Sequence, residues 1–376
     1  MSEAAPDVGA VVSQPAVQRG ARVPDDPRLS ICILVLEQAQ LASDCLDALR
    51  RPGASPPGTE LVVVANGTPP DQLDRLAGHE DVVLVVNREN LGFSAGCNQA
   101  AAVARAPFLV FLNDDSTVAD GCLAALLRAA SEDSAIGAVG ACILSLDGRL
   151  QEAGSVLWRD GSAAHVGEGL ASVPDAYRKP RDVDYASANG FLVTRSAWDV
   201  VGGFDERYFP AYFEDVDLCL ALASHGFRIR YAPEARVIHR GSQSTTSLYR
   251  EFLLTRNQRQ LVEKWGGALD LFEPRPLKES GPEYDAAVER AIRRGADGAT
   301  SSRPAAAGVA AAGPLVPLAA DPTRAATQLR AEFQSYLEQR VISGDQRVSE
   351  LETYVAALWG VRLRRWAGGR LARRRT

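Results

Sequence analysis

Two acidic clusters are the residues of this sequence that could most readily do chemistry. The first, Asn113-Asp114-Asp115, directly follows the apolar run at 108–112. Adjacent carboxylates repel each other unless a cation or solvent offsets their charge, and Mg²⁺ is held by one or two carboxylates together with diphosphate oxygens. This cluster is therefore a candidate metal site. The alternative is a solvated turn whose aspartates cap the next helix.

The second cluster, Glu214-Asp215-Val216-Asp217, opens a segment with helical spacing of apolar residues and follows an aromatic stretch at 208–213. Negative charge at a helix N-terminus is favourable, so capping explains at least one of these acids. Aromatic neighbours exclude water and so raise the pKa of a carboxyl group, which suits a general base. The spacing alone leaves both interpretations open.

Two further polar residues stand where apolar runs end. His239 follows the run at 235–238, and Asn66 opens an Asn-Gly turn after the run at 61–64. A lone histidine is more often structural than a ligand, and Asn-Gly is a common turn dipeptide. Neither residue identifies a site by itself.

The elements around these residues indicate a layered α/β protein. Apolar β-rich runs at 31–36, 61–64, 82–86 and 108–112 alternate with helical patterns at 41–49, 97–106 and 121–130. Strands that are apolar throughout, separated by helices, predict a parallel sheet covered on both faces. Ligands bind outside the carboxyl ends of such strands, which is where Asn66 and the first acidic cluster fall.

The second half of the chain has shorter elements. We expect strands at 142–144, 155–158, 191–194, 228–231 and 235–238, a loop at 161–180, and helices at 196–201, 215–225 and 248–265. The domain boundaries follow from changes in composition. We predict a flexible leader at 1–27, a catalytic domain at 28–270, an extension with an Ala/Pro/Gly-rich linker at 271–320, and a helix with an Arg-rich tail at 321–376.

The last segment carries a short heptad pattern and a basic end. The spacing of three and four residues involves Leu337, Val341, Val348, Leu351, Val355 and Leu358. Such a helix either pairs two chains in a homodimer or packs on its own domain. The Arg-rich end, with Trp366 and Leu371, is suited to peripheral contact with anionic headgroups at the inner face of the cell membrane. The alternative is a solvated tail.

The composition of the 376 residues limits the class of protein and the cellular compartment that we expect. A formal net charge of -6 gives no reason to expect nucleic acid as a partner. The six cysteines form no Cys-x-x-Cys pair, so neither a zinc nor a redox motif is indicated. A reducing, cytoplasmic setting is expected, since the N-terminus has no signal-peptide pattern and no apolar run is long enough to span a bilayer.

Taken in order, six segments resemble the family-2 glycosyltransferases, most nearly the rhamnosyltransferase-like enzymes of bacterial cell-surface polysaccharide synthesis. They are 61–68, 87–98, 111–115, Gly202-Gly203-Phe204-Asp205-Glu206, 213–218 and 237–239. The resemblance covers about residues 29–265. It implies a GT-A fold, which is Rossmann-like with a mostly parallel central sheet and helices on both faces, here followed by a C-terminal helical extension.

The resemblance also implies an activity and the residues that carry it. The family transfers a sugar with inversion from a UDP- or dTDP-sugar to a glycan or lipid-linked acceptor, with Mg²⁺ or Mn²⁺. Asp215 would be the general base with Glu214 beside it, and Asp115 and His239 would contact the metal. The nucleotide-sugar would be bound by Asn66, Asn90, Gly92, Asn98, Asn113, Asp114 and Arg256.

Two departures from the family pattern lie on the nucleotide side. Ala65 stands where the family usually has Asp, and Leu36-Glu37-Gln38 replaces the usual Thr-Tyr-Asn. They keep open the alternative of a non-catalytic relative that binds nucleotide-sugar or protein partners. A different nucleotide-binding α/β enzyme is disfavoured, because no Gly-x-Gly-x-x-Gly or Walker loop follows the first strand. The Gln-x-x-Arg-Trp signature of processive synthases is also absent, which favours addition of a single sugar.

Overall fold

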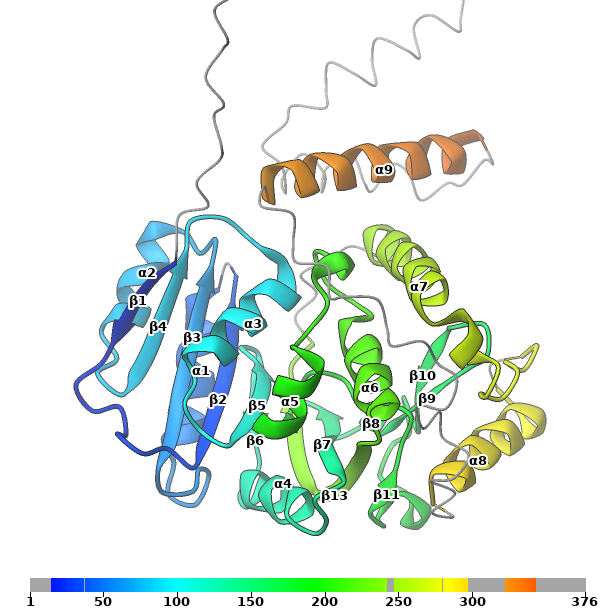
Figure 1. Cartoon of the computed structure of the whole chain (residues 1–376), viewed down its shortest axis with the longest axis horizontal. Coiled ribbons are helices and arrows are strands. Elements are labelled where there is room, and N and C mark those ends of the chain that lie inside the picture. The colour runs from blue at the N-terminus through cyan, green and yellow to red at the C-terminus, as the bar shows by residue number, and fades with distance from the viewer. Residues whose placement is uncertain (1–14, 37, 242–246, 279, 297–321, 343–376) are drawn as a thin grey trace, which may run out of the picture. The chain divides into compact units, whose positions relative to one another are not determined.

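The computed structural model describes residues 15–36, 38–241, 247–278, 280–296 and 322–342. The chain forms two compact units, one of residues 1–241 with 257–322 and the other of 242–256 with 323–376. Figure 1 shows the larger unit as a central sheet flanked by helices. The predicted α/β class is confirmed.

The N-terminal half of the sheet is parallel. Strands β4, β3, β2 and β5 lie side by side in that order, and each pair runs parallel. Their bounds are β2 (Leu29–Val35), β3 (Thr59–Asn66), β4 (Val82–Asn87) and β5 (Phe108–Asn113). Almost every residue of these strands is buried, as continuous apolar runs require when both faces are covered.

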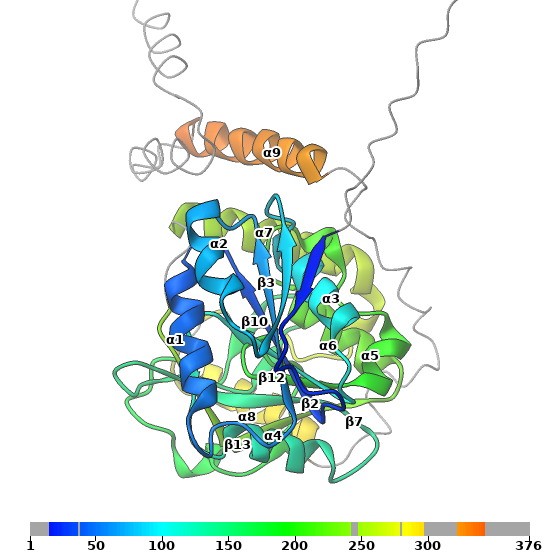
Figure 2. The same cartoon turned by 90° about the vertical axis from the view of Figure 1, so that its left-hand side faces the viewer.

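Helices cover both faces of this sheet. One face shares a core with α1 (Ala39–Arg50) and α4 (Cys122–Ala130), and α2 (Pro70–Ala77) contacts α1. The other face carries α3 (Gly92–Val103), α5 (Arg195–Val201) and α6 (Glu214–Ser224). Figure 2 shows α1 and α2 on one side of the sheet and α3, α5 and α6 on the other. The third helix begins at Gly92 rather than at the predicted Cys97.

The second half makes the whole sheet mixed. Strand β12 (Phe191–Thr194) pairs antiparallel with both β5 and β7 (Ile136–Ser145). Strand β13 (Arg228–His239) then runs parallel to β7, and β11 (Arg181–Asp182) pairs antiparallel with β13. Two short strands, β6 (Ser116–Val118) and β8 (Leu150–Ala153), pair antiparallel with β13 and β7. The expectation of parallel strands therefore holds for the first half of the sheet.

The stretch predicted as a leader contains a strand. Residues Ala16–Arg19 form β1, which pairs antiparallel with β4 at the edge of the sheet. Arg19 Nη1 lies 2.8 Å from Oε1 of Glu60, a buried carboxylate that Arg105 and Ser30 also bind. Residues 1–14 lie outside the described part of the chain.

The predicted loop at 161–180 contains one strand of a small hairpin. Strand β10 (Ala163–His165) pairs antiparallel with β9 (Ser155–Leu157), and His165 lies opposite Ser155. The region also contains a short 3-10 helix, η1 (Asp175–Tyr177). The hairpin shares an apolar cluster, which includes Trp158, with α8 (Pro282–Ala296). The segment predicted as extension and linker thus contains a helix that belongs to the larger unit.

The smaller unit consists, in its described part, of the start of α7 (Ser247–Leu269) and of α9 (Pro322–Ile342). Their aromatic side chains cluster, with the Phe333 ring 4.9 Å from that of Tyr249 and 5.1 Å from that of Phe252. A helix is therefore present where the C-terminal segment begins. The later heptad positions and the Arg-rich tail, residues 343–376, lie outside the described residues, so homodimer and membrane contact stay predictions.

Candidate active site

The first acidic cluster lies at the carboxyl end of β5, as predicted. Strand β6 begins directly after it and pairs with β13, which places His239 opposite Ser116. As a result Nε2 of His239 lies 3.2 Å from Oδ1 of Asp115 and 3.5 Å from Nδ2 of Asn113. Strand pairing thus brings His239 to Asn113 and Asp115, from which it is far apart in the sequence.

The other ring nitrogen of His239 is held by Gln151 on β8. Its Nδ1 lies 2.9 Å from the side-chain oxygen of Gln151, which can only accept a hydrogen bond. Nδ1 therefore carries a proton, and Nε2 faces the carboxylate of Asp115. A polar partner on the far nitrogen is the usual arrangement around a metal-binding histidine.

The side chains of Asp115 and His239 suit a divalent cation that would also bind oxygen atoms of a substrate. Asp115 is 6% exposed, and burial together with the charge of Asp115 raises the pKa of Asp114 to about 7. A cation would offset this concentration of negative charge. Among the described residues no group of three or more His, Cys, Asp or Glu could enclose a metal ion. Asp115 and His239 would therefore leave coordination positions for diphosphate oxygens and water, as Mg²⁺ prefers.

The second acidic cluster begins α6 directly after a strained turn. Tyr212 and Phe213 both have left-handed backbone conformations, with φ of 78° and 75°. Side chains rarely tolerate this conformation without support. The support comes from Asn257 on α7, whose Nδ2 donates to the carbonyls of Ala211 and Tyr212 at 2.9 Å and of Tyr208 at 3.2 Å.

The two acids after this turn have different environments. Glu214 is 6% exposed, and burial followed by the charge of Asp215 raises its pKa well above its usual range. Asp215 is only partly buried and accepts hydrogen bonds from the backbone N–H groups of Val216 and Ala188. Burial is the main reason that the pKa of Asp215 rises to about 6. Asp215 is therefore the more accessible of the two acids, and burial opposes the charged form of Glu214 more strongly than that of Asp215.

Asp217 anchors the helix rather than facing the site. It is 1% exposed, and its oxygens accept from Tyr208, Trp265 and Lys264 at 2.9, 2.7 and 2.8 Å. Lys264 Nζ also lies 2.8 Å from Asp205 Oδ2. A lysine between two buried carboxylates fixes α6 to α7 and to the segment that precedes Asp215.

Three residues predicted to bind the nucleotide-sugar, Asn66, Asn90 and Gly92, lie in one hydrogen-bond network. Asn66 donates to Asn90 Oδ1 and to the Gly92 carbonyl, both at 3.1 Å, and accepts from Asn87 and from the Leu91 amide. These contacts hold the turn that leads into α3. A fourth predicted residue, Asn98, instead exchanges hydrogen bonds with the backbone of Phe204 at 2.9 Å in each direction. Direct contact with a nucleotide stays a prediction for them.

Gly92 is required by this network for a steric reason. Its φ is +82°, and a Cβ atom at this position would lie 2.7 Å from the ring of Phe209. The turn before α3 therefore packs against the segment that precedes Asp215. Arg256, also predicted to bind the donor, belongs to the smaller unit, where its Nε lies 2.6 Å from Glu332 Oε2. Its contact with a diphosphate also stays a prediction.

Three residues of the site were not predicted from the sequence. They are Gln151, Asn257 and Asn189, whose Oδ1 accepts from the amide of Asn113 and the hydroxyl of Ser116 at 3.2 and 3.0 Å. Only Asn257 offers a signal in the sequence, since it is a polar residue at helical spacing between Leu253 and Leu261. Gln151 and Asn189 lie beside other polar or small residues, and no local pattern marks them.

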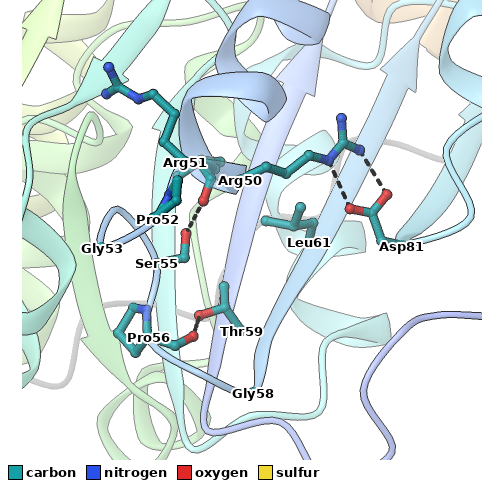
Figure 3. A pocket seen from close by; sticks show the side chains of 11 residues that line it. Arg50, Arg51, Pro52, Gly53, Ser55, Pro56, Gly58, Thr59, Leu61 and Asp81 are labelled. Carbon is teal, nitrogen blue, oxygen red and sulfur yellow. Dashed lines mark hydrogen bonds and ion pairs between the residues drawn. The ribbon is translucent and has the colours of Figure 1, made fainter.

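A hollow of about 340 Å³ lies elsewhere, around the end of α1 and the start of β3 (Figure 3). Arg50, which lines it, is paired with Asp81 at 2.7 Å. This is the amino end of the parallel strands, opposite to the edge that carries the two acidic clusters. We do not assign a site to it.

The chain belongs to the family described as glycosyltransferase-like family 2, whose sequence pattern matches residues 27–261. It is 30% identical over 245 residues to the O-antigen biosynthesis protein RfbC of Myxococcus xanthus, covering 62% of this chain and 19% of that protein. It is 34% identical over 202 residues to the N-acetylglucosaminyl-diphospho-decaprenol L-rhamnosyltransferase of Mycobacterium tuberculosis, covering 48% of this chain and 64% of that protein. The chain thus spans less than two thirds of each of these relatives.

A solved structure confirms the GT-A-like fold. GalNAc-T7, determined with UDP, GalNAc and Mn²⁺, superposes with a TM-score of 0.52 at 16% identity, over 65% of this chain and 49% of that chain. None of the helices in the described residues combines the length and apolar composition needed to cross a membrane.

Proposed function

We propose that this protein transfers a sugar, with inversion, from a UDP- or dTDP-sugar to a hydroxyl of a cell-surface glycan or of its lipid-linked precursor. The observation that carries the proposal is the pairing of β6 with β13. It places His239 against Asp115 at the sheet edge where ligands of α/β proteins bind. The names of the bacterial relatives support the substrate class.

The proposed chemistry is a single displacement. Asp215 takes the proton of the acceptor hydroxyl, whose oxygen forms a bond to the anomeric carbon. The bond from this carbon to the diphosphate breaks, and its electron pair leaves with the nucleoside diphosphate. A Mg²⁺ or Mn²⁺ ion held by Asp115 and His239 would supply positive charge for the leaving group. GalNAc-T7, which shares the fold, holds Mn²⁺ with UDP, in keeping with this proposal.

A panel of UDP- and dTDP-sugars, including dTDP-L-rhamnose, tests the proposal with Mn²⁺ present or removed by a chelator. Release of nucleoside diphosphate with one donor, dependent on Mn²⁺ and lost in Asp115→Asn, is the expected result. Binding of a donor without turnover would instead support the non-catalytic alternative that Ala65 keeps open. Neither binding nor turnover of any donor would reject the proposed function.

A further inference from the structure

A second set of polar side chains lies beside the proposed base. Glu152 on β8, Ser155 on β9 and His165 on β10 are joined by hydrogen bonds, and none of them belongs to the clusters identified in the sequence. The Glu152 side chain is 3% exposed and that of His165 is 35% exposed. A buried carboxylate thus holds an imidazole that reaches solvent.

The hydroxyl of Ser155 defines how His165 is protonated. It donates its single proton to Oε1 of Glu152 at 2.9 Å. Its oxygen can then only accept from Nδ1 of His165, which is also 2.9 Å away. Nδ1 therefore carries a proton, and this nitrogen also lies 3.4 Å from Oε2 of Glu152.

Two successive backbone amides connect this set to the base. The N–H of Ser187 donates to Oε1 of Glu152 at 3.1 Å, and the Ser187 hydroxyl donates to Oε2 at 2.5 Å. The next amide, that of Ala188, donates to Asp215. Consecutive Cα atoms are about 3.8 Å apart, so the carboxylates of Glu152 and Asp215 are held by neighbouring peptide groups and each acts on the charge of the other.

Two other titratable groups face Asp215, and burial opposes the charged form of each. Burial, followed by the charge of Asp215, raises the pKa of the adjacent Glu214 well above its usual range. Burial, followed by the charge of Glu152, also raises the pKa of Tyr185 far above its usual value, and its ring centre lies 6.1 Å from that of His165. Glu152 and His165 therefore supply the charges that act on Asp215 from this side.

We propose that Glu152 and His165 form a positioning pair that sets the pH at which Asp215 can accept the proton of the acceptor hydroxyl. This inference deepens the proposed function and rests on it. The negative charge of Glu152 opposes ionisation of Asp215, and cationic His165 favours it. In keeping with this, burial is the largest influence on the pKa of Asp215, Glu152 raises that pKa further, and His165 lowers it.

The proposal can be tested by removing each charge in turn, because the two removals should shift the pKa of Asp215 in opposite directions. The Asp215 carboxyl can be followed by ¹³C NMR of protein labelled in its aspartate side chains, with the Asp215→Asn variant identifying the signal. Glu152→Gln should lower the midpoint of this titration, and His165→Gln should raise it, each by on the order of half a pH unit. His225→Gln, which changes an exposed histidine directly after α6, is the control and should leave the midpoint unchanged.

The titration needs no donor, so its outcome is separate from that of the turnover test. The proposal would be overturned if the titration midpoints of Asp215 in the two variants stay within error of the wild type or both move in the same direction. His165→Gln removes no buried group and carries the test alone if Glu152→Gln does not fold. Where a donor turns over, the acidic limb of the rate profile should move with the NMR midpoint in each variant.

Discussion

The side-chain oxygen of Gln151 lies 2.9 Å from Nδ1 of His239. The amide nitrogen of Gln151 faces the His239 carbonyl at 3.5 Å, which is the orientation that leaves the oxygen for the ring. Nε2 is then 3.2 Å from a carboxylate oxygen of Asp115, a separation at which a proton or a cation between the two atoms would hold them together. The proposed metal site depends on this orientation of the ring.

Loss of the Gln151 side chain should therefore weaken metal binding more than catalysis. In Gln151→Ala the Mn²⁺ concentration for half-maximal donor turnover should rise about 10- to 100-fold, because the imidazole loses its fixed orientation. The rate at saturating Mn²⁺ should change little. Gln18→Ala, which removes an exposed amide on β1, is the control. An unchanged Mn²⁺ requirement in Gln151→Ala would contradict this account of His239.

Asp215→Asn should abolish transfer and retain donor binding. The amide keeps the shape of the carboxylate but cannot take a proton, and a positioned base contributes roughly 10²- to 10⁴-fold to a rate. The change should appear in kcat, measured by nucleoside diphosphate release, with the Kd for the donor from calorimetry unaltered. Asp199→Asn, at an exposed position on α5, should behave as the wild type. Normal transfer by Asp215→Asn would remove this residue from the role of base.

The raised pKa of Asp215 predicts how rate and stability depend on pH. A base must be deprotonated, so turnover should increase as the pH rises through about 6. Stability should change in the opposite sense: between the ordinary pKa of 3.8 and about 6 the folded protein binds more protons than the unfolded one, so stability falls as the pH rises.

Thermal unfolding of Asp215→Asn measures the loss of stability that ionised Asp215 is expected to cause. The variant should unfold at a higher temperature than the wild type above pH 6, and the difference should become smaller towards pH 4. A functional carboxylate kept in a partly buried position is a common source of such a trade-off. A variant that is less stable than the wild type at pH 7 would show that Asp215 stabilises its surroundings instead.

Asn257→Ala should reduce kcat more than donor affinity. The change leaves three buried carbonyls without their donor and releases the left-handed turn at Tyr212 and Phe213, which places Asp215. The free energy of unfolding should fall by about 1–3 kcal/mol. Gln258→Ala is the matched control, since the neighbouring amide makes one exposed hydrogen bond to Asp160. Equal losses of stability in both variants would argue against the special role of Asn257.

The strands that position the site could be predicted from the sequence, because they follow from the pattern of apolar residues along the chain. Continuous apolar runs identify the four parallel strands, and the acids that follow such a run fall at a strand end, so the position of Asp115 after β5 was predicted. His239 was proposed only through the family resemblance. Its partner Gln151 could not be predicted, because the pairings of β8 with β7 and of β6 with β13 join segments that no local pattern connects.

The predicted nucleotide-binding asparagines show a different limit. A resemblance marks Asn66, Asn90 and Asn98 as belonging together but does not say what they touch. In the structure Asn66 binds Asn90 and the backbone of Gly92, whereas Asn98 binds the backbone of Phe204. An asparagine that shapes a turn and one that binds a ligand look alike in a sequence, because both occupy polar positions at a strand end or at the start of a helix.

The strand at Ala16–Arg19 has a practical consequence for any shortened form of this protein. A sequence-based boundary at residue 28 would discard it and leave one side of β4 without hydrogen-bond partners. That side belongs to a strand of consecutive valines and leucine at 82–86, the kind of open edge on which other chains add and aggregate. The shortest soluble fragment should therefore begin before residue 15, at a point where the sequence itself shows no boundary.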